Sequence, residues 1–180
     1  SLASIDRQLA QLRAERIRKD TNWQAGGLDL GMESQVLGKP LSEPWVCAGP
    51  IEVVAKAQSP FVHVHPPGTR GVRMGSGAKT DGIRYVFKEG LQASSGKKMY
   101  FNIDFRTAAG ADQKGAYRFY LGQGVVASLA IECSITPEAF VIRNGTRWEV
   151  LRKLQTGKWY TLQITIDPVK KTYSGLVGSI

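Results

Sequence analysis

Residues 99–106 read Met99-Tyr100-Phe101-Asn102-Ile103-Asp104-Phe105-Arg106, and they give the most regular alternation in the sequence. Apolar side chains stand at the odd positions and mainly polar ones at the even positions. Successive side chains of a β-strand point to opposite faces, so one face of this segment is apolar and the other mainly polar. Lys97–Thr107 is therefore predicted to be a strand with one face in a core. Its predicted partner is Ala116–Gly122, where the same alternation recurs.

Further strands are predicted downstream, and turn residues separate them. Asn144-Gly145 joins two apolar-alternating runs, which predicts a hairpin with a type I′ turn, because both central residues of that turn need positive φ. A final hairpin is predicted from Trp159–Asp167 and Thr172–Ile180 around the turn 168–171. Eight or more short strands with turns roughly every ten residues are typical of a sandwich or barrel. We therefore expect an all-β, antiparallel β-sandwich over residues 25–180.

The N-terminal residues 1–24 are predicted to form a separate helical unit. Leu2, Ile5, Leu9 and Leu12 follow a 3-4-3 spacing, which places them on one face of a helix that runs to about Lys19. The apolar stripe is as narrow as the seam between two paired helices. The helix either packs on the sandwich or contacts a helical neighbour.

Lys and Arg outnumber Asp and Glu by 24 to 15, a formal net charge of +9. Such an excess can mark a protein that binds nucleic acid, an anionic polysaccharide or a membrane surface. Many of these charges lie in the first twenty residues, and the rest are spread singly along the strands, which is typical of solvated faces. We therefore expect no nucleic-acid partner. No stretch approaches the roughly eighteen apolar residues that a membrane span needs.

No metal site is predicted from the cysteines or the histidines. Cys47 and Cys133 lie far apart, without partners at metal-ligand spacing, so they are either one long-range disulfide or two buried thiols. His63 and His65 point to one side of an extended segment, but no third ligand stands nearby in the sequence.

Four motifs carry a resemblance to a known family: Gly157-Lys158-Trp159-Tyr160-Thr161-Leu162, Ile164-Thr165-Ile166-Asp167, Lys171-Thr172-Tyr173-Ser174-Gly175 and Phe101-Asn102-Ile103-Asp104-Phe105-Arg106. They resemble strands of concanavalin A-like jelly rolls, the group of lectins, glucanases and laminin-G domains. The segment from Pro60 to Arg73 is more loosely similar to sandwich modules embedded in large extracytoplasmic bacterial proteins. The resemblance spans Leu28 to Ile180. It implies a two-sheet jelly roll, a periplasmic or secreted location, a carbohydrate-related or adhesive role and, in some members, a structural calcium but no other cofactor.

The sequence departs from the family's glycosidases at the catalytic carboxylates. Those enzymes carry a Glu-x-Asp-x-x-Glu strand, whereas Asp104 is followed here by Arg106. The other acidic residues of the strands are isolated: Glu132, Glu138, Glu149 and Asp167. Glycoside hydrolysis needs two carboxyl groups across the scissile bond. We therefore expect no catalytic residues, unless a pair such as Asp104 and Glu132 assembles from different strands.

Six residues are the candidates for a ligand-binding face: Tyr100, Asn102, Asp104, Arg106, Tyr120 and Trp148. The first four share the polar face of one strand and combine an aromatic ring, an amide, a carboxylate and a guanidinium, which are groups that recognise sugars and acidic polymers. We expect a non-catalytic carbohydrate-binding or adhesive module of a larger extracytoplasmic protein, whose partner is a polysaccharide or glycan. The alternative is a structural accessory domain that contacts neighbouring domains of the same chain, and a glycoside-processing enzyme is the third class.

Overall fold

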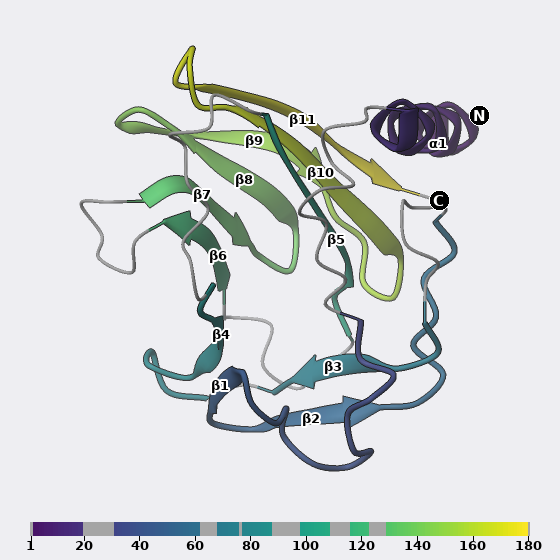
Figure 1. Ribbon diagram of the computed structural model, residues 1–180, viewed down its shortest axis with the longest axis vertical. Helices are drawn as coiled ribbons and strands as arrows, with labels where there is room; N and C mark the ends of the chain where they lie inside the picture. Colours follow the sequence, from purple (N-terminus) through teal and green to yellow (C-terminus); the bar gives the residue numbers. More distant parts are fainter. Residues whose placement is uncertain are drawn as a thin grey trace.

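The computed structural model describes residues 2–19, 31–61, 68–75, 77–87, 98–108, 116–122 and 129–179. In these ranges the chain forms one helix and eleven strands, and the strands pair antiparallel in sheets (Figure 1). The prediction of an all-β chain with an N-terminal helix is confirmed. His63 and His65 lie outside the described residues.

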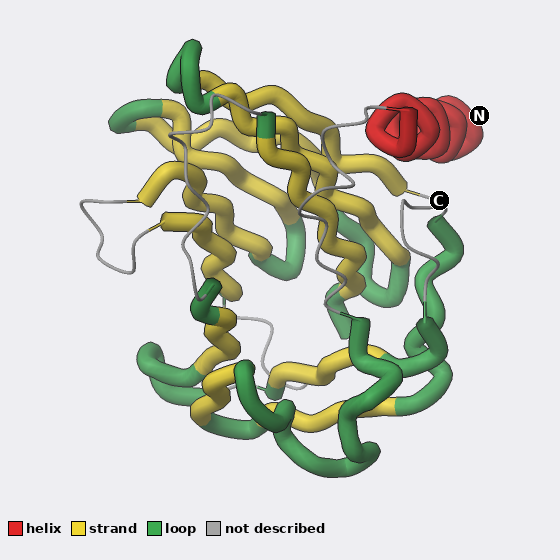
Figure 2. The backbone as a smooth tube through the Cα atoms, viewed as in Figure 1, coloured by secondary structure: helices red, strands yellow, loops and turns green. Residues whose placement is uncertain are grey.

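The elements follow one another as α1 (Leu2–Lys19), β1 (Trp45–Ala48), β2 (Ile51–Val54), β3 (Gly71–Met74), β4 (Gly82–Tyr85), β5 (Met99–Arg106), β6 (Tyr117–Gly122), β7 (Leu129–Ile135), β8 (Ala139–Asn144), β9 (Arg147–Lys153), β10 (Trp159–Asp167) and β11 (Thr172–Ser179). Among the described residues these strands form four sheets, not two: β6-β7-β8-β9, β11-β10-β5, β1-β4 and β2-β3. Figure 2 shows the two short sheets at one end of the molecule and the two larger ones at the other.

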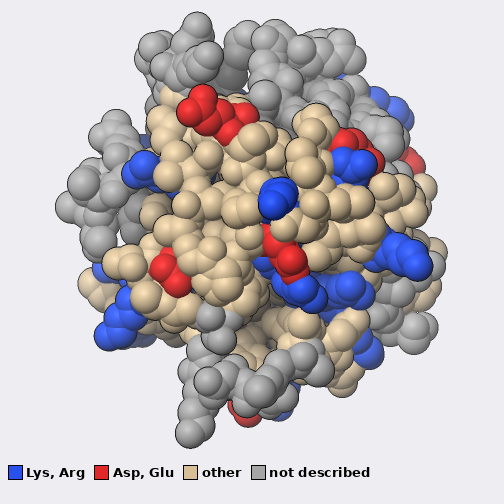
Figure 3. Space-filling model, turned by 90° about the horizontal axis from the view of Figure 1, so that it is seen from below, with Lys and Arg blue, Asp and Glu red and all other residues tan. Residues whose placement is uncertain are grey.

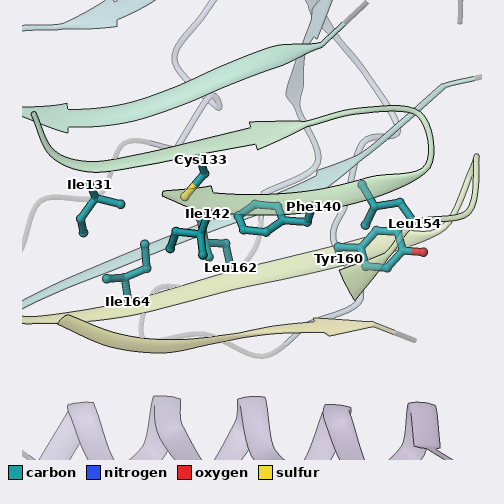
Figure 4. Close-up of a cluster of buried hydrophobic side chains, with 8 residues drawn as sticks. All are labelled: Ile131, Cys133, Phe140, Ile142, Leu154, Tyr160, Leu162 and Ile164. Carbon is teal, nitrogen blue, oxygen red and sulfur yellow. The ribbon is translucent and has the colours of Figure 1, made fainter. Parts of the chain in front are cut away.

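The hydrophobic core lies between the two larger sheets (Figure 4). The inward side chains of β7 and β8 meet those of β10, and the buried set comprises Ile131, Cys133, Phe140, Ile142, Leu154, Tyr160, Leu162 and Ile164. Phe105 of β5 stacks on Phe140 of β8 with the ring centroids 5.9 Å apart. Each such side chain contributes about 1.5–3 kcal/mol when it leaves water. Of the apolar face predicted for β5, Phe101 and Phe105 pack against this core, whereas Ile103 is 37% exposed.

The predicted partner of β5 is wrong. The strand pairs with β10, and Ile103 lies opposite Leu162, whereas β6 pairs with β7 in the other large sheet. β5 and β6 meet through the core instead, where Phe101 stacks on Phe119 at 4.9 Å. Two amphipathic strands can join their apolar faces either side by side in one sheet or face to face across a core, and the alternation is the same in both cases.

The hairpin at Asn144-Gly145 is confirmed, but its turn is shifted by one residue. Asn144 pairs with Arg147, so the two central residues are Gly145 and Thr146. Of these residues only Gly145 has positive φ, at 60°. A turn with glycine at the first central position and positive φ there alone is type II′, not the predicted type I′.

Both cysteines are free thiols, because Cys133 lies in the core and Cys47 in the β1-β4 sheet. Burial raises the pKa of the Cys133 thiol to about 12, since a thiolate cannot be solvated there. This thiol therefore stays protonated in the folded protein at neutral pH and behaves as a small apolar side chain.

Candidate ligand-binding face

One row of side chains crosses the outer face of the β6-β7-β8-β9 sheet. Tyr120 on β6 lies opposite Glu132 on β7, and Arg143 on β8 lies opposite Trp148 on β9. Glu132 and Arg143 are joined by a 2.9 Å hydrogen bond from the Arg143 Nη1 to the Glu132 Oε2. The register of these strands thus brings two of the predicted ligand residues, Tyr120 and Trp148, onto a single face.

The centre of the row is a buried carboxylate between two arginines. The Glu132 side chain is 2% exposed, and its Oε1 pairs with the Arg118 guanidinium while its Oε2 pairs with Arg143. Arg118 stands on β6 and Arg143 on β8, one on each side of β7. Arg143 also donates from Nε to the Gly145 carbonyl at 3.0 Å. The carboxylate therefore holds both guanidinium groups in place, while the arginine side chains themselves stay largely exposed.

The two aromatic rings at the ends of the row are accessible. Tyr120 is 48% exposed and Trp148 is 47% exposed. They stand on the first and last strands of this sheet, three strand spacings of about 4.8 Å apart, so roughly 14 Å separates their positions. We call this row of Arg118, Tyr120, Glu132, Arg143 and Trp148 the aromatic-arginine row. It is long enough for a short oligosaccharide and too long for a single sugar ring.

The other four predicted ligand residues lie on the opposite side of the molecule, on the outer face of the β11-β10-β5 sheet. Asn102 donates from Nδ2 to the Thr161 Oγ1 at 3.3 Å and to the Asp104 Oδ1 at 3.4 Å. The Arg106 guanidinium lies 5.1 Å from the centroid of the Trp159 ring, a cation-π contact that occupies one face of that ring. The polar groups of this face are thus already engaged with one another.

Helix α1 lies over this second face. Figure 4 shows the helix on the side of β10 and β11 that is opposite to the core. Arg13 donates to the Thr165 Oγ1 at 3.3 Å, and burial lowers the pKa of its guanidinium. Thr161 and Gln163, which point outward from the centre of β10, are both buried. The middle of β10 is therefore closed to a ligand, and Tyr100 next to it is half-buried, whereas Asn102 and Arg106 on β5 are exposed.

The structure therefore splits the predicted site in two and adds residues that the prediction missed. Tyr120 and Trp148 share the outer face of the β6-β7-β8-β9 sheet, whereas Tyr100, Asn102, Asp104 and Arg106 share the outer face of the β11-β10-β5 sheet, where Asn102 and Arg106 are exposed. Arg118, Glu132 and Arg143 were missed as members of the site. The sequence did hold a signal for one of them, because Arg118 and Tyr120 stand two residues apart on a strand and so share a face.

A catalytic pair of Asp104 and Glu132 does not form. Asp104 points outward from β5 and Glu132 outward from β7, so the two carboxyl groups lie on opposite sides of the core. Facing sheets alone are about 10 Å apart, and hydrolysis of a glycosidic bond requires carboxyl groups within roughly 5–10 Å in one pocket.

Among the described residues no three His, Cys, Asp or Glu side chains gather closely enough to hold a metal ion. The described part of the chain also contains no helix with the length and apolar character needed to cross a membrane. On the face that Figure 3 shows, the Lys and Arg side chains are interspersed with Asp and Glu and form no single basic patch. This distribution is typical of a solvated surface.

Comparison with known proteins gives no relative to this chain: no protein-family model matches it, and no curated protein or solved structure is significantly similar to it.

Proposed function

We propose that this domain is a non-catalytic carbohydrate-binding module of a larger extracytoplasmic protein, and that the aromatic-arginine row is its binding face. The observation that carries the proposal is the pair of half-exposed rings, Tyr120 and Trp148, at the two ends of one row. Aromatic rings offer flat apolar faces with a polar tip, which suits a sugar ring with its C–H faces and hydroxyl edges. In this proposal the two larger sheets are the two layers of a concanavalin A-like jelly roll.

The arginines between the rings support binding of a sugar rather than simple apolar contact. A guanidinium has five N–H donors, and the bonds to Glu132 and Gly145 use two of those on Arg143. The other donors of this exposed side chain can bind sugar oxygens. The separation of Asp104 from Glu132 supports binding without hydrolysis.

We expect Trp148→Ala to weaken polysaccharide binding by about tenfold, because the variant loses one stacking surface worth roughly 1.4 kcal/mol. Tyr120→Ala should act in the same direction. The measurement is isothermal titration of the purified domain against a panel of neutral and sulfated polysaccharides, with calcium and with a chelator, at two salt concentrations.

Tyr117→Ala is the matched control, because Tyr117 is equally exposed and lies on the same strand, but it points to the other face and bonds to the Met74 carbonyl. Circular dichroism checks that each variant folds. An effect of Tyr117→Ala as large as that of Trp148→Ala, or no binding to any polysaccharide, would contradict the proposal.

A second candidate function, a structural accessory domain, is favoured by the orientation of α1. Ile5, Leu9 and Leu12, which form its apolar stripe, are all about half exposed. The helix instead rests on the sheet through Arg13. The first of the two sequence-based alternatives for α1 is therefore met, because the helix packs on the sheet. The exposed stripe supports the second alternative, a helical neighbour, as a proposal.

The partner that best fits this stripe is an acidic amphipathic helix of a neighbouring domain. The 3-4 spacing continues through Arg16 and Lys19, and both are exposed. A second copy of α1 fits poorly. A parallel pair places Arg16 and Lys19 against the same cations of the other copy, and an antiparallel pair places them against the apolar Leu9 and Ile5. A helix with apolar residues at one end and Glu at the other complements the stripe.

We expect a synthetic helical peptide with a leucine seam and Glu opposite Arg16 and Lys19 to bind the domain, as measured by fluorescence anisotropy. The variant Leu9→Ser/Leu12→Ser should abolish this binding without changing polysaccharide binding, because the stripe and the aromatic-arginine row lie on different elements. Equal binding of the same peptide with Lys in place of Glu would contradict the idea. Tighter binding to anionic lipid vesicles than to the peptide would also contradict the idea. A dimer in sedimentation equilibrium that becomes a monomer in the double variant would contradict it as well.

A further inference from the structure

The strongest feature that the proposed function leaves unexplained is the charge balance of the aromatic-arginine row. Arg118 and Arg143 carry two positive charges, and Glu132 carries one negative charge, so one positive charge remains in excess. The carboxylate is buried and each of its oxygens is ion-paired with one arginine, whereas the two arginine side chains are about half exposed. A ligand at this face therefore meets the cations and not the carboxylate.

The exposed charged groups of this row only donate hydrogen bonds. A guanidinium has no acceptor, and the one carboxylate is used beneath the arginines. Neutral sugars present hydroxyl groups that both donate and accept, so they gain from a mixture of donors and acceptors. An oxyanion only accepts, and the planar guanidinium matches the geometry of carboxylate and sulfate oxygens.

Glu132 also holds the arginines in position before a ligand arrives. Strands β6 and β8 present Arg118 and Arg143 from the two sides of β7, and the carboxylate between them draws both toward the middle of the row. A long side chain fixed in this way loses less conformational freedom when it binds. The two cations are thus held at one carboxylate on β7, between the strands that carry Tyr120 and Trp148.

From this geometry we infer that the module binds an acidic polysaccharide, with a sugar oxyanion held between Arg118 and Arg143 and sugar rings on Tyr120 and Trp148. The inference rests on the proposed function and names its ligand class. The oxyanion is a uronic carboxylate or a sulfate ester, which share the chemistry that the row recognises. A nucleic acid fits less well, because a groove that follows its backbone neutralises several phosphates and the row has a single positive charge in excess.

The test uses three polymers with one backbone: dextran, carboxymethyl dextran and dextran sulfate. Their affinities for the purified protein are measured by isothermal titration at low and at physiological salt. We expect the two charged polymers to bind at least about tenfold more tightly than dextran at physiological salt. The better of the two identifies the oxyanion as a carboxylate or a sulfate.

Variants then separate this site from the net charge of the protein. Arg143→Gln and Arg118→Gln should each remove about tenfold of the affinity for the better polymer. Arg147→Gln is the matched control, since it removes the same charge from the same sheet at an exposed position beside the row, on the opposite face of β9. It should leave the affinity nearly unchanged. Equal losses in all three variants would show that only net charge matters and would overturn the inference.

Glu132→Gln gives the sharpest outcome, because the two explanations predict opposite signs. The substitution removes one negative charge and so raises the net charge by one, and binding by net charge alone would become tighter. If Glu132 positions the arginines, binding becomes weaker in spite of the added charge. Circular dichroism establishes that the variant folds, and the two arginine variants test the inference if it does not.

Three further results distinguish failure of this inference from failure of the proposed function. If dextran sulfate binding is lost in Trp148→Ala but unchanged in Arg118→Gln and Arg143→Gln, the face binds glycans and the inference on the oxyanion is wrong. If a single-stranded oligothymidylate binds the same face more tightly than dextran sulfate does, the oxyanion is a phosphate and the inference is wrong. If no polysaccharide binds, both the inference on the oxyanion and the proposed function are wrong.

Discussion

Phe140→Ala is expected to lower the free energy of unfolding by about 3–5 kcal/mol. Phe140 is fully buried at the centre of the core between the two larger sheets, where it stacks on Phe105. Truncation removes the transfer free energy of the ring and leaves a cavity that the two sheets cannot close, because their spacing is set by the other core side chains. Domains have total stabilities of about 5–15 kcal/mol, so the variant should lose a large share of the stability of the fold.

The measurement is the midpoint of urea unfolding, followed by tryptophan fluorescence. Phe140→Leu keeps most of the volume and should cost about 1.5 kcal/mol or less. Val169→Ala, at an exposed turn position, should change the free energy of unfolding by no more than about 0.5 kcal/mol. A loss below 1 kcal/mol for Phe140→Ala, on the order of that for a surface site, would mean that the two larger sheets do not share this core.

Gly175→Ala is expected to destabilise the fold by about 2–3 kcal/mol, because the added methyl group meets the backbone of the neighbouring strand. A Cβ at Gly175 would lie 2.2 Å from the Gln163 carbonyl oxygen. Gly175 lies opposite Ile164 in the β10-β11 ladder, so the strands can only accept the methyl group by moving apart and weakening their hydrogen bonds.

Gly82→Ala is the matched control for this prediction. Gly82 also lies in a strand, and a Cβ there would meet no atom within 4 Å. This variant should keep or slightly raise the stability, because alanine reduces the freedom of the unfolded chain. Thermal unfolding of the two variants side by side makes the comparison, and equal midpoints would refute the close approach of β10 and β11 at Gly175.

Elements defined by their own residues were predictable from the sequence. The strands β5 and β10 and the final hairpin were confirmed, because period-two patterning and turn residues act between neighbours in the chain, although β10 is buried on both faces. The partner of β5 was not predictable. Its apolar face is equally suited to a neighbour in the same sheet and to a sheet across the core, and only the assembled fold distinguishes these arrangements.

In the candidate site, too, features of single segments were predictable, and features that depend on the assembled fold were not. Tyr120 and Trp148 could be selected as aromatic residues with outward parity, and they share the outer face of the β6-β7-β8-β9 sheet. The burial of Glu132 could not be predicted, because it arises from arginines on the two neighbouring strands, and the alternation within one strand does not give the register between strands. The packing of α1 on the outer side of β10 and β11 could not be predicted either, since it depends on contacts between segments that are far apart in the sequence.

The pairing of β5 with β10 also has a consequence for the order in which the chain acquires its structure. Asn102 on β5 bonds to Thr161 on β10, a residue 59 positions later, while the β6-β7, β7-β8 and β8-β9 pairs join consecutive strands. Local hairpins close quickly, and distant strand pairs form slowly because a long loop must first be closed. During synthesis the four-stranded sheet can therefore form while the backbone hydrogen-bonding groups of β5 are still without a strand partner, because β10 has not yet left the ribosome.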